Sequence, residues 1–218
     1  MFGYNFNEAG EKYREALQNR QELAKKWDLT EDDLALEPSV AQIDAWLKED
    51  LDLAVQRALD RLGLVRDELV REPLVIYGPL FWTTDGIPDD ELVAVKLVDT
   101  LRFSCYQLVV VCLSAERIAT YSANFNFLRY VFLNEKTVEY LYRDIVSVST
   151  EEKSTNYSLP NGKTLRRTQV FRLVVPGDSI EVVINSPEIK DLLGGTPQLS
   201  DHEKSVRVIR EMLRTKKG

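Results

Sequence analysis

Residues 153–184, KSTNYSLPNGKTLRRTQVFRLVVPGDSIEVVI, decide the fold class. Asn161-Gly162 is a strong hairpin signal, because both residue types tolerate a positive φ. Pro176-Gly177-Asp178 indicates a second turn. The flanking residues are rich in β-branched and aromatic side chains, which favour strands. The stretch therefore predicts three antiparallel strands, at 153–159, Arg166–Val175 and Ile180–Ile184.

Strand patterns continue upstream as far as Pro73, where the period of the apolar residues changes from helical to extended. Asn134-Glu135-Lys136 is expected to form a short turn between two of these strands. The chain is thus expected to contain about seven strands in meander order, with short connections. The upstream segments with a strand pattern, which together with the three segments above are expected to make up about seven strands, are Leu74–Trp82, Arg102–Leu113, Glu116–Ser122, Leu128–Leu133, Thr137–Tyr142 and Ile145–Thr150.

Helical periodicity occurs on both sides of the strands. The first 70 residues follow it, most clearly in an apolar stripe from Ile43 to Leu62 that ends at Gly63. A last amphipathic helix is expected at 200–215, with Ser200 and Glu203 as a capping box. Residues Ser186–Leu199 contain two prolines and two glycines and are predicted to form a loop. The sequence therefore predicts an α+β fold.

The stripe from Ile43 to Leu62 is too apolar to remain in water. It can bury against an earlier helix, against the outer wall of the β domain, or against a second copy of the chain. We expect the first arrangement, through Tyr13 and Leu17, with the helix pair docked by charge on the last helix. A homodimer formed through the N-terminal helices is the alternative.

Charge divides the chain in the same place as periodicity. The net charge is −7, and residues 1–72 hold 10 basic and 17 acidic residues, whereas residues 73–218 hold 18 of each. We therefore predict an acidic helical segment at 1–70 and a β domain at 73–218. A nucleic-acid-binding surface needs concentrated positive charge, so this distribution argues against nucleic acid as a partner.

The order of strands followed by one helix resembles the pleckstrin-homology-like superfold. Residues 140–148, YLYRDIVSV, are similar to the aromatic-then-Ile-x-x-Val run of GRAM and bacterial pleckstrin-homology-like domains. Residues 113–121, LSAERIATY, resemble the strand pair before it. The resemblance covers about 73–215 and implies a seven-stranded antiparallel barrel capped by the C-terminal helix. It also implies a binding module rather than a reaction.

Lipid-binding members of that superfold carry basic residues on the first two strands and the loop between them. The corresponding loop here, residues 83–91, holds Asp85, Asp89, Asp90 and Glu91 and no base. Four carboxylates repel an anionic headgroup, so we expect weak membrane binding or none.

The sequence carries few signals of catalysis or of metal binding. Cys105 and Cys112 are seven residues apart in one predicted strand, which places them on opposite faces and excludes a disulfide between them. His202, the sole histidine, is expected to be a solvated residue in the first turn of the last helix. These residues cannot assemble a zinc site, and no phosphate-binding glycine motif occurs. We therefore expect no metal and no cofactor.

Low cysteine usage favours a reducing compartment, and the N-terminus has no apolar segment typical of a signal peptide. The longest apolar run, Leu108–Leu113, is six residues, whereas a membrane span needs about 20. A cytoplasmic location is the expectation.

Two groups of basic residues are the candidate binding sites. Arg207, Arg210 and Arg214 form a stripe on the last helix, which is either a solvated face or a docking surface for an acidic partner. Lys163, Arg166 and Arg167 follow the Asn161-Gly162 turn, where they either contact anionic headgroups or keep an edge soluble.

We therefore expect a non-enzymatic binding or adaptor module that recognises a protein partner. Two alternatives stay open. The first is a peripheral membrane adaptor that uses Lys163, Arg166 and Arg167 to bind anionic lipid. The second is an enzyme whose site is assembled from residues scattered through the sequence.

Overall fold

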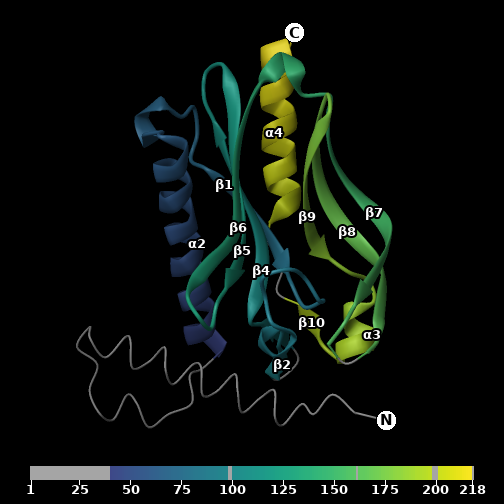
Figure 1. Cartoon of the computed structure of the whole chain (residues 1–218). Coiled ribbons are helices and arrows are strands. Elements are labelled where there is room, and N and C mark those ends of the chain that lie inside the picture. Colours follow the sequence, from purple (N-terminus) through teal and green to yellow (C-terminus); the bar gives the residue numbers. More distant parts are fainter. Residues whose placement is uncertain (1–39, 98–99, 161, 198–200, 218) are drawn as a thin grey trace, which may run out of the picture.

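The computed structural model describes residues 40–97, 100–160, 162–197 and 201–217. The helix predicted before residue 40 and the capping residue Ser200 lie outside these ranges. The described residues form an α+β structure in layers, in which a four-stranded sheet separates helix α2 from helix α4 and a second, three-stranded sheet (Figure 1).

The four-stranded sheet is antiparallel throughout and has the strand order β1-β4-β5-β6. Cys105–Leu113, which forms β4, is a central strand and is almost completely buried, because both of its faces are covered. Its alternate residues therefore enter two different clusters of the core. The four strands are Leu74–Pro79 (β1), Cys105–Leu113 (β4), Arg117–Asn126 (β5) and Val131–Leu141 (β6).

The three-stranded sheet confirms the hairpins predicted from residues 153–184. It consists of β7 (Ser147–Ser158), β8 (Thr164–Val175) and β9 (Asp178–Asn185), paired in that order and antiparallel. Gly162 and Gly177 have φ values of 77° and 82° at the two turns, a region that favours glycine.

Strand pairing among the described residues leaves the two larger sheets separate. The closed barrel of seven strands expected from the sequence is therefore replaced by two antiparallel sheets of four and three strands. The two sheets come together where β1 lies beside β9, with Gly78 against the backbone of Val183.

Four segments differ from the prediction. The strands predicted at Ile145–Thr150 and 153–159 form one strand, β7, which is continuous from Ser147 to Ser158. Residues 128–142 contain one continuous strand, β6, because Asn134 adopts a φ of 54° and forms part of a bulge instead of a turn. The strand predicted at Arg102–Leu113 is divided at Ser104 into β3 (Thr100–Phe103) and β4. The predicted loop Ser186–Leu199 contains helix α3 (Ile189–Leu193) and strand β10 (Thr196–Pro197).

A third, small sheet was not predicted. Strand β10 pairs parallel with β3, which pairs antiparallel with β2 (Ala94–Leu97). Short 3₁₀ turns complete the connections, at Arg66–Glu68 (η3), Asp89–Glu91 (η4) and Tyr142–Asp144 (η5).

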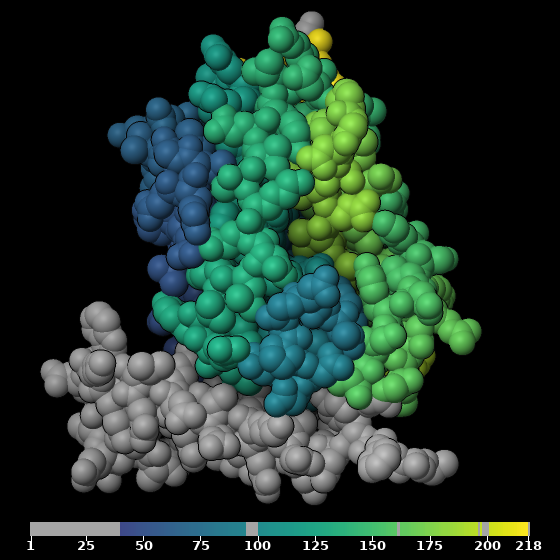
Figure 2. Space-filling view, in the orientation of Figure 1, coloured from purple at the N-terminus to yellow at the C-terminus, as the bar shows by residue number. Residues whose placement is uncertain are grey.

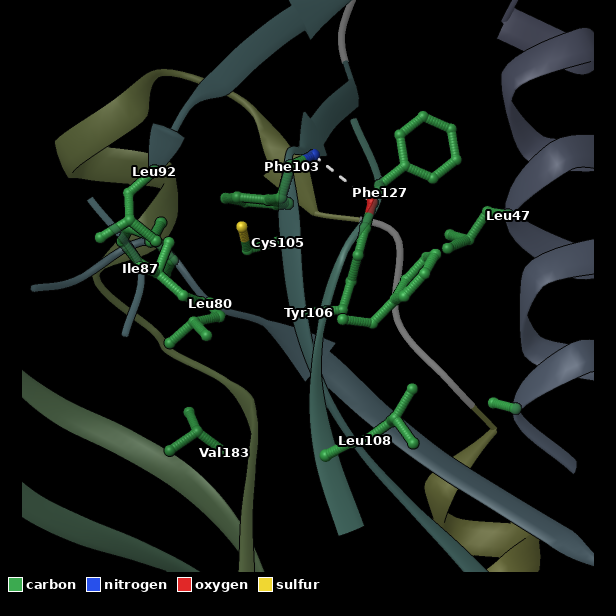
Figure 3. Close-up of a cluster of buried hydrophobic side chains, with 14 of the residues drawn as sticks. Leu47, Leu80, Ile87, Leu92, Phe103, Cys105, Tyr106, Leu108, Phe127 and Val183 are labelled. Atoms are coloured by element: carbon green, nitrogen blue, oxygen red, sulfur yellow. Dashed lines mark hydrogen bonds between the residues drawn. The ribbon is translucent and has the colours of Figure 1, made fainter. Parts of the chain in front are cut away.

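Helix α2 (Val40–Leu62) packs on the outer face of the four-stranded sheet, against β4, β5 and β6. Ile43, Leu47 and Ala58 of its apolar stripe are at most 2% exposed and share a core cluster with the sheet. Figure 3 shows Leu47, Tyr106 and Phe127 among the side chains of this cluster. The stripe thus buries against the sheet, and the described contacts replace our expectation of docking on the last helix.

Helix α4 (His202–Lys217) lies on the other side of the same sheet, where it packs against β1, β7 and η5. Val206 and Ile209 enter the second core cluster, in which residues from both larger sheets meet. This confirms the apolar face predicted for the last helix. His202 is only 8% exposed, so its predicted place in solvent is wrong.

Candidate functional site

Two bidentate ion pairs anchor α2, one near each end of the helix: the first joins it to the small third sheet and the second to the four-stranded sheet. Arg102 of β3, 4% exposed at its side chain, donates from Nε and Nη2 to the Asp44 carboxylate at 2.7 and 2.8 Å. Arg57 of α2 donates to the Glu135 carboxylate of β6 at 2.6 and 2.7 Å. The helix supplies the acid at one end and the base at the other, so reversing its direction would place like charges together at both contacts.

Glu135 is the centre of a larger polar cluster. Its carboxylate also accepts hydrogen bonds from Arg61 Nη2 at 3.0 Å and from the Tyr121 hydroxyl at 2.7 Å. These donors, Arg57 first among them, lower the pKa of Glu135 to about 2. Burial and the adjacent carboxylate raise the pKa of Tyr121. Glu135 therefore stays ionised and Tyr121 stays protonated. In these states Glu135 accepts all of these hydrogen bonds, which join β6 to α2 and β5.

A groove of about 280 Å³ opens beside this cluster, between α2 and the start of β6. Arg57 lines it, with the guanidinium carbon 5.4 Å from the centroid of the Phe132 ring. Leu53 and Tyr130 stand on opposite walls and are 37% and 49% exposed. In Figure 2 the surfaces of α2 and β6 meet on the face toward the viewer. The lining residues are Leu53, Gln56, Arg57, Asp60, Tyr130, Val131 and Phe132.

The wall formed by β6 has an unusual backbone. Tyr130 has a φ of 55° and Asn134 a φ of 54°, both uncommon in residues other than glycine. The Tyr130 ring packs edge-on against Phe125 at 6.4 Å, and Asn134 Nδ2 donates to the carbonyl of Asp85 at 3.1 Å. Backbone conformations of this kind are over-represented at functional sites.

Strand β6 is also an edge of its sheet. Among the described residues it pairs with β5 alone, and each of its residues is at least partly exposed. Its second edge can therefore pair with the backbone of another segment. The groove and this edge begin at the same residues, 130–132.

The basic residues predicted after the Asn161-Gly162 turn lie at the end of the β7–β8 hairpin and are exposed. Two carboxylates offset their charge. Glu188 accepts from Arg167 Nε at 3.4 Å and from the backbone NH of Arg166 at 2.8 Å, and Glu152 lies 3.8 Å from Arg167 Nη1. This end of the molecule is therefore less positive than its sequence indicates.

The predicted basic stripe lies on the exposed side of α4. Arg207, Arg210 and Arg214 are all exposed. Arg210 Nε donates to the carbonyl of Val148 at 3.1 Å, and Lys217 Nζ donates to the carbonyl of Ile145. The basic end of α4 and the end of the β7–β8 hairpin lie at opposite ends of the molecule (Figure 1), so the two predicted clusters do not form one site.

Both cysteines are free and fully buried. Burial raises the pKa of Cys105 to about 12 and that of Cys112 to about 11, so neither is a ready thiolate nucleophile. Within the described ranges, no group of three or more His, Cys, Asp or Glu side chains is arranged to hold a metal ion. In the same part of the chain, no helix combines the length and apolar character needed to cross a bilayer.

Sequence reasoning missed the groove between α2 and β6. Its two walls are about 75 residues apart in the chain, and the residues between 128 and 136 were assigned partly to a turn. Two signals were available: Leu53 lies on the polar side of the α2 stripe, and Tyr130 precedes a strand without belonging to it. No protein-family model, curated protein or solved structure matches the chain.

Proposed function

We propose that this chain is a non-enzymatic binding module that recognises a protein partner. Its architecture is pleckstrin-homology-like, with β2 and β3 inserted after the first strand. The meander β1-β4-β5-β6, the meander β7-β8-β9 and the closing helix α4 support this assignment. The two free cysteines support a reducing compartment such as the cytoplasm.

The observation that carries the proposal is the groove between α2 and β6. It places exposed Leu53 and Tyr130 beside the Arg57 guanidinium and a free strand edge. Tyrosine and arginine are enriched among the residues that dominate protein interfaces. Asp60, whose carboxylate accepts from Gln56 Nε2 at 3.0 Å, adds a negative charge to the rim.

The occupant is an extended segment of the partner, added to β6 as a further strand. Main-chain hydrogen bonds to β6 hold the segment, and the groove selects its side chains. An apolar side chain fits between Leu53 and Tyr130, and a basic side chain one or two positions away pairs with Asp60. The groove therefore selects a short motif that combines an apolar and a basic residue.

Selection from a random 12-residue peptide library on the immobilised full chain tests the proposal. Enriched peptides should carry the apolar-basic motif, and Leu53→Asp and Tyr130→Asp should each weaken their binding at least about tenfold. Glu139→Gln, on the exposed far part of β6, is the matched control. Peptides that bind the groove variants and the parent chain equally would place the site elsewhere, and a library without enrichment would overturn the proposal.

The membrane adaptor and the enzyme remain alternative proposals with less support. The acids that neighbour Arg166 and Arg167 reduce the attraction of that hairpin for anionic lipid. Salt-sensitive binding to anionic vesicles, lost when Lys163, Arg166 and Arg167 are replaced by Glu, would favour the first alternative.

A further inference from the structure

Arginines over most of the surface are paired with acids, and those of α4 are not. Within the described residues, Arg207 and Arg214 have no ion-pair partner. The arginines that do pair are Arg57, Arg61, Arg66, Arg102, Arg117, Arg129, Arg143, Arg167 and Arg172. Arg71 and Arg166 also lack an ion-pair partner among the described residues, but three of the five described arginines without one lie on α4. Unpaired positive charge is therefore concentrated on this helix.

The charge on α4 is positive but discontinuous. Residues 202–217 contain six bases and two acids, Glu203 and Glu211, a net charge of +4 with His202 neutral. The excess is concentrated in the last two turns, where Arg210, Arg214 and Lys217 follow one another at intervals of four and three residues. Glu203 and Glu211 repel a flat anionic bilayer that covers the whole stripe. A single extended polypeptide segment is narrower and can contact the bases without meeting these acids.

The neighbouring edge of β7 supplies an apolar contact beside these bases. Arg210 and Lys217 donate to the carbonyls of Val148 and Ile145, and Val146, between them in the chain, is 65% exposed. The same two bases thus bind the backbone on either side of Val146, at the start of β7. Strand β7 is an edge of its sheet, pairing with β8 alone among the described strands.

We propose that the exposed face of α4 from Arg207 to Lys217, together with the start of β7, binds an acidic, extended segment of a protein partner. Arg210 and Arg214 are separated by about 6 Å along the helix axis. Alternate side chains of an extended chain are spaced by about 6.5–7 Å, so acids at alternate positions match them. An apolar residue of the segment covers Val146. This site is separate from the groove between α2 and β6 and carries the opposite charge preference.

Fluorescence anisotropy with a labelled peptide of alternating Glu and Val residues tests the site on the full chain. The parent chain should bind it, and affinity should fall as salt rises. The double variant Arg207→Glu/Arg214→Glu should weaken binding at least about tenfold, a change of about 1.4 kcal/mol. These two residues have no described ion-pair partner, so the variant should keep the parent melting temperature.

Three controls decide the result. Arg166→Glu changes an exposed base at the other end of the molecule and should leave the affinity unchanged, as should Leu53→Asp in the groove. A peptide with Lys in place of Glu should not bind. Equal binding of the acidic peptide to the double variant would overturn the proposal. The proposal would also be overturned if the chain bound vesicles rich in phosphatidylserine but not the peptide, and the double variant lost this binding. That result would show that the stripe binds a membrane.

Discussion

Gly78 of β1 lies directly against the backbone of Val183 in β9. A Cβ atom added at Gly78 would be 2.1 Å from the Val183 carbonyl oxygen and 2.6 Å from the Cα of Ile184. The contact joins the edge strand of one sheet to the edge strand of the other, so the absence of a side chain at residue 78 sets the distance between the two sheets.

Gly78→Ala should therefore destabilise the fold by about 3 kcal/mol, because backbone atoms cannot move away as a flexible side chain would. Chemical denaturation of the full chain measures this. Gly177→Asn is the control, since its turn leaves open space around Gly177 and asparagine tolerates the φ of 82°. Equal stability of Gly78→Ala and the parent would mean that the sheets can separate without cost.

Glu135→Gln should remove the contact that holds the C-terminal half of α2. The folded pKa of Glu135, about 2, lies below the ordinary value of about 4.3. Its contribution to stability is therefore complete above pH about 4.3 and is lost as the pH falls toward 2. At pH 7 the variant should lose about 2 kcal/mol. At pH 2 it should approach the parent chain.

Chemical denaturation at several pH values measures the difference in unfolding free energy between the variant and the parent chain, both at pH 7 and at pH 2. Glu139→Gln is the matched control, because Glu139 pairs with Arg117 at the surface, where an ion pair contributes less than about 1 kcal/mol. A difference between parent and Glu135→Gln that does not change with pH would contradict the electrostatic role.

The strands were predictable because their signals are local. Glycines with positive φ at residues 162 and 177 mark both turns of the three-stranded sheet, and the flanking residues show the extended pattern directly. The exception is β6. Asn134 supplies a turn signal, but its tolerance of positive φ is used for a bulge, because strand pairing with β5 continues on both sides of it. Local chemistry does not distinguish these two uses.

The position of α2 was not predictable, although its apolar face was. The ion pairs that anchor the helix join residues far apart in the sequence. Asp44 and Arg102 are separated by 58 residues, and Arg57 and Glu135 by 78 residues. Sequence reasoning assigned the acidic charge of the N-terminal third as a whole to the basic stripe of the last helix. Net charge does not reveal which individual acid meets which base, so the groove that results from this docking was missed as well.

Ile209→Asp should destabilise the chain by more than about 4 kcal/mol, because the new carboxylate would be buried without a partner. Ile209 is fully buried where α4 meets residues of both larger sheets. Lys204→Asp, which places an exposed acid in the first turn of the same helix, should leave the free energy of unfolding nearly unchanged. Thermal denaturation of the two variants compares them, and similar melting temperatures would show that α4 is not needed to close the core.

The fragment 73–218 tests the domain boundary predicted near residue 71. It retains both larger sheets and α4, so we expect a cooperative thermal transition. Without α2, however, the face of the sheet that meets Leu47 and Ala58 becomes exposed to water. The fragment should therefore melt below the full chain and bind a dye for apolar surface. A full-length chain with Leu47→Asp should show the same change, whereas Lys48→Asp, on the exposed side of the helix, should not. A fragment without a cooperative transition would show that α2 belongs to the folding unit itself.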